Sequence, residues 1–333
     1  MADITVLGSG GWGTALAVTA ARHGHMVTLW SPFEQEIEAI RRHGQHKKLL
    51  PGIAVPPSIE LTTALETVRE ADLVVMAVPS FAIASTARQL QPYLREGAVI
   101  ANAGKGLEEG TFRRFTEVIE AELPGIRAVA LSGPSHAEEV GRGIPTLVVS
   151  ASRDADAARF VQETLMNPQF RIYTSEDVVG VELGGALKNV IALSAGICDG
   201  LSMGDNTRAA LMTRGLAEIA RLGVKLGANA GTFAGLSGIG DLIVTCSSMH
   251  SRNRRAGILI GQGVPPAEAV ASVGTVEGYL VAETAYHLAQ KVAVDVPLLE
   301  TCYRICYEGF SPSKAVAALM ERPGRAEEEE HWL

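Results

Sequence analysis

The stretch Ile4-Thr-Val-Leu7-Gly8-Ser-Gly10-Gly-Trp-Gly13-Thr14 decides the fold of this chain. Its apolar start predicts a short buried strand, and three spaced glycines follow this strand directly before a helical segment. Gly8 permits a sharp turn, Gly10 lets the backbone approach a pyrophosphate group, and Gly13 lets the helix pack closely on the strand. The first N–H groups of that helix would bind phosphate oxygens. The stretch therefore predicts a site for a dinucleotide.

The sequence on either side of this stretch alternates between strand-like and helical segments. The predicted strands are Ile4–Leu7, Met26–Trp30, Leu73–Val78, Ala98–Ala101, Ala128–Ser132, Thr146–Ser150 and Phe170–Tyr173. The predicted helices between them are Thr14–His23, Phe33–Arg42, Ala82–Leu94, Phe112–Leu123 and Asp154–Met166. Such alternation predicts an α/β fold, a Rossmann-like doubly wound and mostly parallel sheet with helices on both faces.

Beyond Ser175 the apolar pattern has the period of helices throughout. The predicted helices are 176–200, 206–227, 252–262, 266–272, 278–291, 297–307 and 312–321, and Gly235–Gly240 is predicted to be a loop. A chain of 333 residues is long for one hydrophobic core. We therefore expect a dinucleotide-binding Rossmann domain at 1–178 and an all-α substrate and dimerisation domain at 179–323. A mobile acidic tail is expected at 324–333.

Composition narrows the class of protein. The apolar fraction of 47% and the charged fraction of 20% are ordinary for a globular protein, and the formal charge of −8 argues against nucleic acid as the main partner. The four cysteines are too few for a disulfide scaffold, and we interpret them as reduced thiols. Cys302 and Cys306 share a helix face, but no histidine or carboxylate completes a metal-ligand pattern, so no metal is expected.

One segment, Val178 to Cys198, is about as long and as apolar as a membrane span. Glu182 and Lys188 near its centre make a membrane location costly, and a buried helix is the better interpretation. No membrane span is therefore expected. The sequence enters its first strand almost at once, which predicts that no signal peptide precedes the fold and that the protein is cytoplasmic.

The choice between NADH and NADPH depends on the end of the second strand, where a carboxylate favours NAD and a basic residue favours NADP. Here the chain reads Leu29-Trp-Ser-Pro-Phe-Glu34, with neither kind of residue in the usual place. Ser31 and Glu34 form the pattern of a capping box for the following helix. The preference is thus unresolved and discrimination should be modest, unless Arg41 or Arg42 reads the ribose.

Lys188 is the most informative candidate for catalysis because its neighbours in Leu183-Gly-Gly-Ala-Leu-Lys-Asn-Val190 are mostly small or aliphatic. A buried lysine has a lowered pKa and can donate a proton to an alkoxide at neutral pH. We expect Asn189 to orient it. A nearby Asp241 would raise the pKa that burial lowers, and the balance stays open. The alternative is a lysine that extends from a helix face to solvent.

Three further segments carry candidate ligands. Lys105 follows a strand at the sheet edge where ligands of α/β folds bind, although such lysines are often surface residues. Ser135 is predicted to cap the next helix, and His136 is an available acid–base group or a structural residue. Ser251–Arg255 begins a helix, where arginines and N–H groups favour an anion. The alternative for that segment is a solvated basic face.

Taken in order along the chain, these segments resemble the NAD(P)-dependent glycerol-3-phosphate dehydrogenase family of the prokaryotic type. The motifs that carry the resemblance are Gly8-Ser-Gly-Gly-Trp-Gly-Thr-Ala-Leu16, Ala103-Gly-Lys-Gly-Leu107, Ser132-Gly-Pro-Ser135, Leu183-Gly-Gly-Ala-Leu-Lys-Asn-Val190, Thr213-Arg-Gly-Leu-Ala-Glu218, Gly240-Asp-Leu242, Ser251-Arg-Asn-Arg254 and Val276-Glu-Gly278. They span nearly the whole chain. The resemblance implies interconversion of dihydroxyacetone phosphate and sn-glycerol 3-phosphate with NADPH or NADH, in support of glycerophospholipid synthesis.

The resemblance also implies a role for individual residues. Lys188 would be the proton donor and acceptor. The implied substrate-binding residues are Lys105, Gly133, Ser135, Lys188, Asp241, Ser251, Arg252 and Asn253. The implied cofactor-binding residues are Gly8, Gly10, Gly11, Trp12, Gly13, Lys105, Ala137, Arg252, Thr275 and Glu277. Members often carry a basic residue where this chain has Pro32 and Phe33. The family also implies a homodimer.

Two other functions compete with this interpretation. A β-hydroxyacid dehydrogenase also pairs a Rossmann domain with a helical one and uses a lysine beside an asparagine. The Ser251–Arg255 cluster favours a small phosphorylated substrate instead. A regulatory module that binds a dinucleotide without chemistry would leave Lys188 unexplained.

Overall fold

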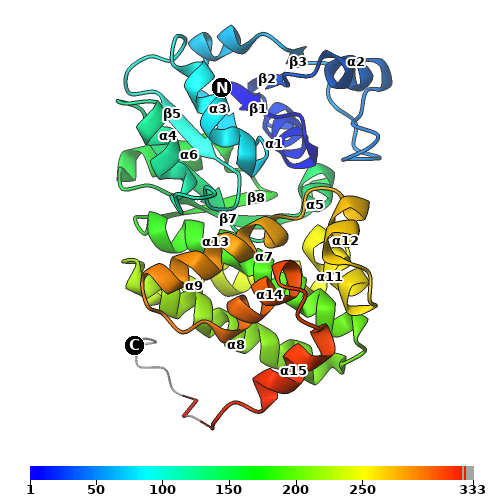
Figure 1. Cartoon of the computed structure of the whole chain (residues 1–333). Coiled ribbons are helices and arrows are strands. Elements are labelled where there is room, and N and C mark those ends of the chain that lie inside the picture. Colours follow the sequence, from blue (N-terminus) through cyan, green and yellow to red (C-terminus); the bar gives the residue numbers. More distant parts are fainter. Residues whose placement is uncertain (325, 328–333) are drawn as a thin grey trace. The chain divides into compact units, whose positions relative to one another are not determined.

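The computed structural model describes residues 1–324 and 326–327, which form two compact units (Figure 1). The first unit contains Met1–Gly104 and Phe115–Val178, and the second contains Lys105–Arg114 and the chain from Val179 onward. The segment with Lys105 thus belongs to the second unit by its contacts. The acidic tail expected at 324–333 lies outside the described residues, apart from residues 324, 326 and 327.

The first unit alternates strands and helices. Its strands are β1 (Asp3–Leu7), β2 (Met26–Trp30), β3 (Ile59–Thr62), β4 (Leu73–Met76), β5 (Val99–Asn102), β6 (Arg127–Ser132), β7 (Thr146–Ala151) and β8 (Phe170–Ser175). Its helices are α1 (Gly11–Arg22), α2 (Glu34–His43), α3 (Ile83–Leu90), α4 (Phe115–Glu122), α5 (Ala137–Arg142) and α6 (Ala155–Leu165), with 3-10 helices η1 (Leu65–Glu70) and η2 (Ser80–Ala82).

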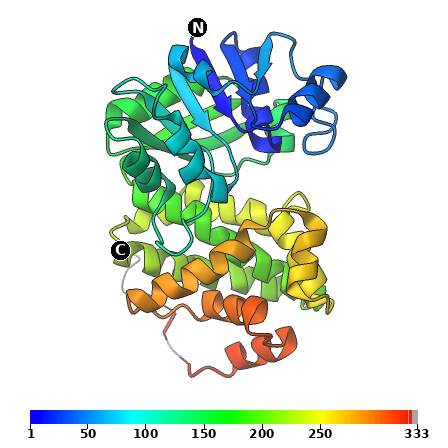
Figure 2. The same cartoon turned by 45° about the horizontal axis from the view of Figure 1, so that its top comes forward.

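The strands form a single sheet in the order β3-β2-β1-β4-β5-β6-β7-β8 (Figure 2). Neighbouring strands are parallel, except that β6 and β7 run antiparallel. The predicted doubly wound and mostly parallel sheet is confirmed. Since β2 pairs with one edge of β1 and β4 with the other, the winding direction changes at β1. Ligands of such folds bind beyond the carboxyl ends of the strands at this point.

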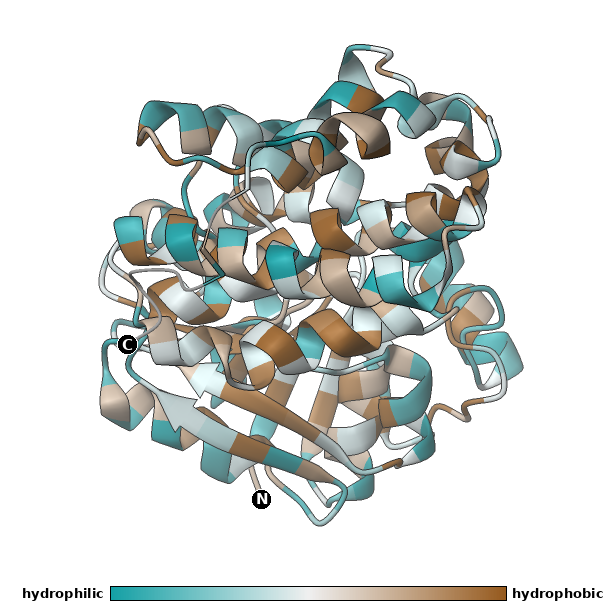
Figure 3. Cartoon of the chain, turned by 90° about the horizontal axis from the view of Figure 1, so that it is seen from below, coloured by the Kyte–Doolittle hydropathy of each residue, from teal (hydrophilic) through white to brown (hydrophobic). Residues whose placement is uncertain are grey.

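Both faces of the sheet are buried. Along β4, Leu73 and Val75 pack into one hydrophobic cluster, whereas Val74 and Met76 pack into a second one. Successive side chains of a strand point to opposite faces, so the two clusters lie on the two sides of the sheet. Figure 3 shows hydrophobic residues along the strands. This pattern explains why the central strands could be recognised as continuous apolar runs.

The second unit is helical. Its helices are α7 (Val178–Gly200), α8 (Gly204–Lys225), α9 (Ala230–Phe233), α10 (Asp241–Ser247), α11 (Arg252–Gly261), α12 (Pro266–Val273), α13 (Glu277–Lys291), α14 (Pro297–Tyr307) and α15 (Pro312–Met320). A short π-helical segment, η3 (Leu236–Gly240), precedes α10. The sequence predicted a loop at Gly235–Gly240 and missed α10. The segment η3 is broken at Gly238, whose φ of −96° and ψ of −105° are not helical.

Helix α7 forms the centre of the second unit. It is long and apolar enough to cross a membrane, with a mean hydropathy of 1.4, but 89% of its most apolar window is buried inside the protein. Its side chains, among them Leu187 and Ile191, contribute to one cluster with the surrounding helices. A helix that is apolar all round is a core helix when other helices cover it. The segment Ala230–Ser247 meets the same criteria of length and composition, yet it consists of α9, η3 and α10.

Candidate active site

The glycine turn of the first unit has the geometry that its spacing predicted. Gly8 has a φ of +108°, and a Cβ there would lie 2.7 Å from the carbonyl oxygen of Ala77. A Cβ at Gly13 would lie 2.0 Å from the carbonyl oxygen of Gly8, so α1 packs directly on the turn. Nothing lies within 4 Å of a Cβ built on Gly10. Glycine is thus required at two positions by the protein itself, and the third leaves room for a ligand.

The start of α1 supplies donors for such a ligand. Gly10 is the N-cap residue, and neither a capping side chain nor an acidic residue occupies the first turn. The indole Nε1 of Trp12 donates to the carbonyl oxygen of Ala103 at 3.2 Å, which fixes this side chain beside the turn. The N–H groups and the positive end of the helix dipole suit a pyrophosphate. The residues present therefore fit a dinucleotide.

Helix α2 begins differently from the prediction. Its N-cap is Phe33, and no side chain caps it. The Ser31 hydroxyl donates to the carboxylate of Glu36 at 2.8 Å and accepts from the backbone N–H of Phe33 at 3.3 Å. The prediction of a capping box of Ser31 and Glu34 is therefore wrong, because the helix begins at Glu34 with Phe33 as its N-cap, two residues after Ser31. Arg41 donates to Glu38 and to the Leu61 carbonyl oxygen.

The segment after β6 contains three of the predicted site residues. Gly133 has a φ of +138°, and a Cβ there would lie 3.0 Å from the Cα of Val148. The Ser135 hydroxyl donates to the Gly133 carbonyl oxygen at 2.9 Å and closes this turn. His136, not Ser135, is the N-cap residue of α5, and Ala137 begins the helix. The prediction that Ser135 caps the helix is wrong because its hydroxyl is bonded backward along the chain.

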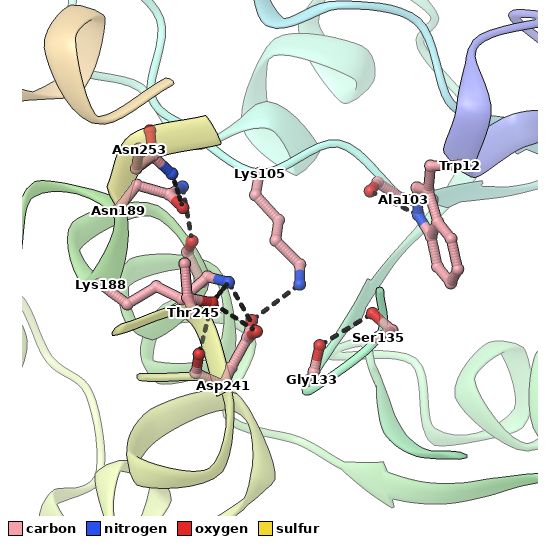
Figure 4. Close-up of polar contacts among 11 residues, drawn as sticks. Trp12, Ala103, Lys105, Gly133, Ser135, Lys188, Asn189, Asp241, Thr245 and Asn253 are labelled. Atoms are coloured by element: carbon pink, nitrogen blue, oxygen red, sulfur yellow. Dashed lines mark hydrogen bonds and ion pairs between the residues drawn. The ribbon is translucent and has the colours of Figure 1, made fainter. Parts of the chain in front are cut away.

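The second unit holds a buried carboxylate between two lysines (Figure 4). The ammonium of Lys188, on α7, donates to Oδ1 of Asp241 at 2.6 Å and to Oγ1 of Thr245 at 2.6 Å. The ammonium of Lys105 donates to Oδ2 of Asp241 at 2.7 Å. Lys188 is 5% exposed and Asp241 1% exposed. The predicted burial of Lys188 is confirmed, and Lys105, Lys188 and Asp241 are brought together.

Burial and the charges of two neighbouring side chains change the pKa of Lys188 in different directions. Burial has the largest effect and lowers the pKa of Lys188 from 10.5 to about 8, while the Asp241 carboxylate raises it and the Lys105 ammonium lowers it. The effect of burial on this pKa is larger than the effect of the carboxylate. The balance that the sequence left open therefore favours a lysine that exchanges its proton near neutral pH.

Helix α10 carries both acceptors of the Lys188 ammonium. Asp241 and Thr245 are four residues apart and share one face of the helix. The Thr245 hydroxyl donates to the Asp241 carbonyl oxygen at 2.6 Å, so its lone pairs face the lysine. Helix α7 packs closely on η3, the segment directly before α10, because a Cβ at Gly184 would lie 2.5 Å from the Ser237 carbonyl oxygen. The sequence analysis missed Thr245, although its spacing from Asp241 was a usable signal.

Asn189 lies next to Lys188 but bonds elsewhere. Its Nδ2 donates to the Gly185 carbonyl oxygen at 3.2 Å, and its Oδ1 accepts from Nδ2 of Asn253 at 2.9 Å. Oδ1 of Asn253 accepts from the backbone N–H of Gly278 at 2.8 Å. The expectation that Asn189 orients Lys188 is therefore replaced by a different role. Asn189 and Asn253 connect α7 to the starts of α11 and α13.

The start of α11 is the segment expected to bind an anion. Ser251 is its N-cap and accepts from the backbone N–H of Arg254 at 3.2 Å, while Arg252 is exposed at the first helical position. Arg254 donates to Asp199 at 2.8 Å, which makes it a structural residue of this cluster. At the start of α13, Thr275 and Glu277 are half-buried.

The described residues contain no group of three or more histidine, cysteine, aspartate or glutamate side chains that could hold a metal ion. All four cysteines are free and buried.

A Rossmann unit with a fitting glycine turn, followed by a helical unit with a buried lysine of lowered pKa, defines a dinucleotide-dependent oxidoreductase. Family models for the N-terminus and the C-terminus of NAD-dependent glycerol-3-phosphate dehydrogenase match residues 3–158 and 177–317. The chain belongs to this family, whose members use NADH or NADPH.

Individual relatives agree over nearly the full length. The glycerol-3-phosphate dehydrogenase [NAD(P)+] of Moorella thermoacetica is 54% identical over 324 residues, 96% of each chain. That of Desulfitobacterium hafniense is 48% identical over 331 residues, 99% of this chain and 94% of the relative. The crystal structure of the Coxiella burnetii glycerol-3-phosphate dehydrogenase, 38% identical, has a TM-score of 0.92 and covers 96% of this chain and 99% of its own.

Proposed function

We propose that this dehydrogenase reduces dihydroxyacetone phosphate reversibly to sn-glycerol 3-phosphate and so supplies glycerophospholipid synthesis. The observation that carries the proposal is the buried Lys188, whose ammonium is bonded to Asp241 and Thr245 at 2.6 Å each. A reduced nicotinamide dinucleotide, when bound, would supply the hydride that adds to the carbonyl carbon of the substrate. The protein supplies the proton and the charge that this chemistry requires.

Lys188 is the proton donor in the direction of reduction. Hydride addition places a negative charge on the former carbonyl oxygen, and the Lys188 ammonium transfers a proton to this oxygen to give the alcohol. An ammonium has three N–H donors, of which Asp241 and Thr245 receive two, so the third can face the substrate oxygen. In the reverse direction the neutral amine accepts the hydroxyl proton. A pKa of about 8 gives substantial populations of both forms.

Asp241 and Lys105 determine the position of the Lys188 nitrogen and the charge around it. The Asp241 carboxylate fixes the position of the Lys188 nitrogen and opposes the effect of burial on its pKa. Lys105, with a side chain 19% exposed, places a second positive charge on the same carboxylate. Its charge attracts the anionic substrate and polarises the carbonyl group.

We propose that the substrate phosphate binds at the start of α11. Arg252 provides a planar fork of donors, and the first N–H groups of the helix add to it. Ser251 and Asn253 hold this start in place through their own hydrogen bonds. The remaining substrate roles, of Gly133 and Ser135, rest on the family resemblance.

The proposed cofactor-binding residues rest partly on geometry and partly on the family resemblance. Gly8, Gly10, Gly11, Trp12 and Gly13 form the turn and helix start that fit a pyrophosphate. Ala137, Thr275, Glu277, Lys105 and Arg252 are assigned to the cofactor from the family resemblance. We further propose that the protein is a cytoplasmic homodimer, that its first unit binds the dinucleotide, and that its second unit carries the substrate and dimer contacts.

The test is the oxidation of NADH and NADPH by the purified protein with dihydroxyacetone phosphate, followed by the loss of nicotinamide absorbance. Turnover that requires this substrate supports the proposal. A set of small β-keto acids serves as the comparison, because β-hydroxyacid dehydrogenases have the same domain arrangement. Turnover of a keto acid without turnover of dihydroxyacetone phosphate would contradict the proposed function.

A further inference from the structure

A carboxylate connects the glycine turn to the end of β2. Oε2 of Glu36, in the first turn of α2, accepts hydrogen bonds from the hydroxyls of Ser9 and Ser31. Ser9 lies between the first two glycines of the turn, and Ser31 directly follows β2. Both serines are 1% exposed, whereas the Glu36 side chain is 31% exposed. The two buried hydroxyls thus hold a carboxylate that remains accessible.

Neighbouring side chains lower the pKa of Glu36, so its carboxyl group stays charged. Nε2 of His46 lies 3.5 Å from Oε1 of Glu36. The nearby His46 ring, followed by the hydrogen bonds from Ser9 and Ser31, lowers the pKa of Glu36 to about 2 against the opposing effect of burial. Glu36 is therefore anionic throughout the neutral range.

The position matters because the adenosine ribose of a dinucleotide lies at the end of the second strand in a Rossmann fold. A carboxylate there bonds the ribose 2′-hydroxyl, and a basic residue accommodates a 2′-phosphate. In this chain the position after β2 is Ser31, whose hydroxyl is bonded to Glu36. The carboxylate thus comes from the next helix, five residues further along the chain.

The charged side chains of α2 near Glu36 favour NADH over NADPH. Glu34, in the same turn of α2, accepts from the Thr63 hydroxyl at 3.2 Å and adds a second negative charge. Arg41 is bonded to Glu38 and to the Leu61 carbonyl oxygen. Arg42 follows Glu36 by six residues, about 9 Å along the helix axis at 1.5 Å per residue. Along α2 the carboxylates of Glu34 and Glu36 therefore lie nearer to the end of β2 than Arg42 does.

We propose that Glu36, held by Ser9 and Ser31, selects NADH over NADPH by accepting a hydrogen bond from the 2′-hydroxyl and repelling a 2′-phosphate. The sequence analysis predicted only modest discrimination, because Ser31, Pro32 and Phe33 include no charged residue. Glu36 supplies the charged group that these positions lack. The selection of NADH rests on the proposed function only in requiring a bound dinucleotide.

The test is isothermal titration calorimetry of the protein with NADH and with NADPH, without substrate. The wild-type protein should bind NADH more tightly by about 10- to 150-fold, the range expected for one hydrogen bond to a charged group. Glu36→Gln keeps the shape and removes the charge, so most of this ratio should be lost. Glu70→Gln, at the exposed end of η1, makes the same change in net charge and should leave the ratio unchanged.

Three outcomes would overturn the proposal. One is a wild-type ratio near one or in favour of NADPH, which needs no variant to be measured. Another is a Glu36→Gln protein in which both affinities fall equally, since Glu36 would then only support the glycine turn. The third is binding of neither cofactor, which would also contradict the family function. Tight NADH binding without turnover of dihydroxyacetone phosphate would contradict the proposed substrate alone.

Discussion

Each unit of this protein contains a carboxylate with hydroxyl partners, but the neighbours of the two carboxylates differ in charge. Asp241 lies between the ammonium groups of Lys105 and Lys188 and is 1% exposed. Glu36 lies between two serine hydroxyls and is 31% exposed. The charge of Asp241 is balanced inside the protein, so this residue positions other groups. The charge of Glu36 is held by mostly neutral donors and is available to a ligand.

The largest expected effect comes from removing the proton donor. Lys188→Met keeps the length and the apolar stem of the side chain, so the fold should survive. General acid catalysis contributes about 10²–10⁴-fold, and kcat should fall by this amount while the Kd for NADH stays nearly unchanged. Steady-state kinetics and calorimetry measure the two quantities. A variant that retains half of the wild-type kcat would remove Lys188 from the mechanism.

Removing the negative charge of Asp241 should mainly reduce the stability of the fold. Asp241→Asn leaves two ammonium groups without their shared carboxylate, and the loss of one partner from a buried pair costs about 3–5 kcal/mol. A large fall in Tm is expected, together with a further fall in the pKa of Lys188. The control is Asp205→Asn, because its ion pair with Arg208 is exposed and such pairs contribute about 0–1 kcal/mol. Equal Tm values for the two variants would contradict an internally balanced charge at Asp241.

A smaller effect is expected at the phosphate site. Arg252→Ala removes one charged hydrogen-bonding group, so kcat/KM for dihydroxyacetone phosphate should fall by at least about 10–150-fold. Arg252→Lys should recover part of it, since the charge returns without the fork. Arg159→Ala, at an exposed position of α6 outside the site, is the control and should change little. Activity on unphosphorylated dihydroxyacetone should be affected much less. Equal losses on both substrates would show that Arg252 does not bind the phosphate.

Local patterns predicted the parts of the fold that depend on neighbouring residues. β2 was predicted with its observed ends, and the glycine turn was predicted from its spacing between a predicted strand and a predicted helix. The short edge strand β3 was missed because the alternation of apolar and polar residues in Ile59–Thr62 covers only four residues. α10 was missed because the glycines before it were interpreted as a loop.

The contacts that give the site its chemistry were harder to predict. Burial of Lys188 followed from its apolar neighbours, but its carboxylate partner lies 53 residues away in the sequence. Lys105 and Asp241 are separated by 136 residues. Glu36 could not be predicted, because the residue that contacts the ribose usually lies directly after the second strand, and only the structure shows which carboxylate the Ser31 hydroxyl contacts. Pairings at such separations depend on tertiary packing, which one sequence does not encode locally.

The central claim is that Lys188 exchanges the proton, and its lowered pKa gives the most direct test. Burial moves the pKa of Lys188 from 10.5 to about 8. Reduction needs the ammonium, so kcat/KM for dihydroxyacetone phosphate should fall as the pH rises through about 8. Oxidation of sn-glycerol 3-phosphate needs the neutral amine, so its kcat/KM should rise over the same range and then level off. A substrate phosphate titrates near pH 6, well below this transition.

The decisive measurement is the pH dependence of kcat/KM in both directions, at saturating NADH and NAD+, for the wild-type protein and Lys188→Met. The account predicts mirror-image transitions near pH 8 in the wild-type protein and neither transition in the residual activity of the variant. Transitions that persist unchanged in Lys188→Met, or wild-type profiles that are flat through this range, would contradict it.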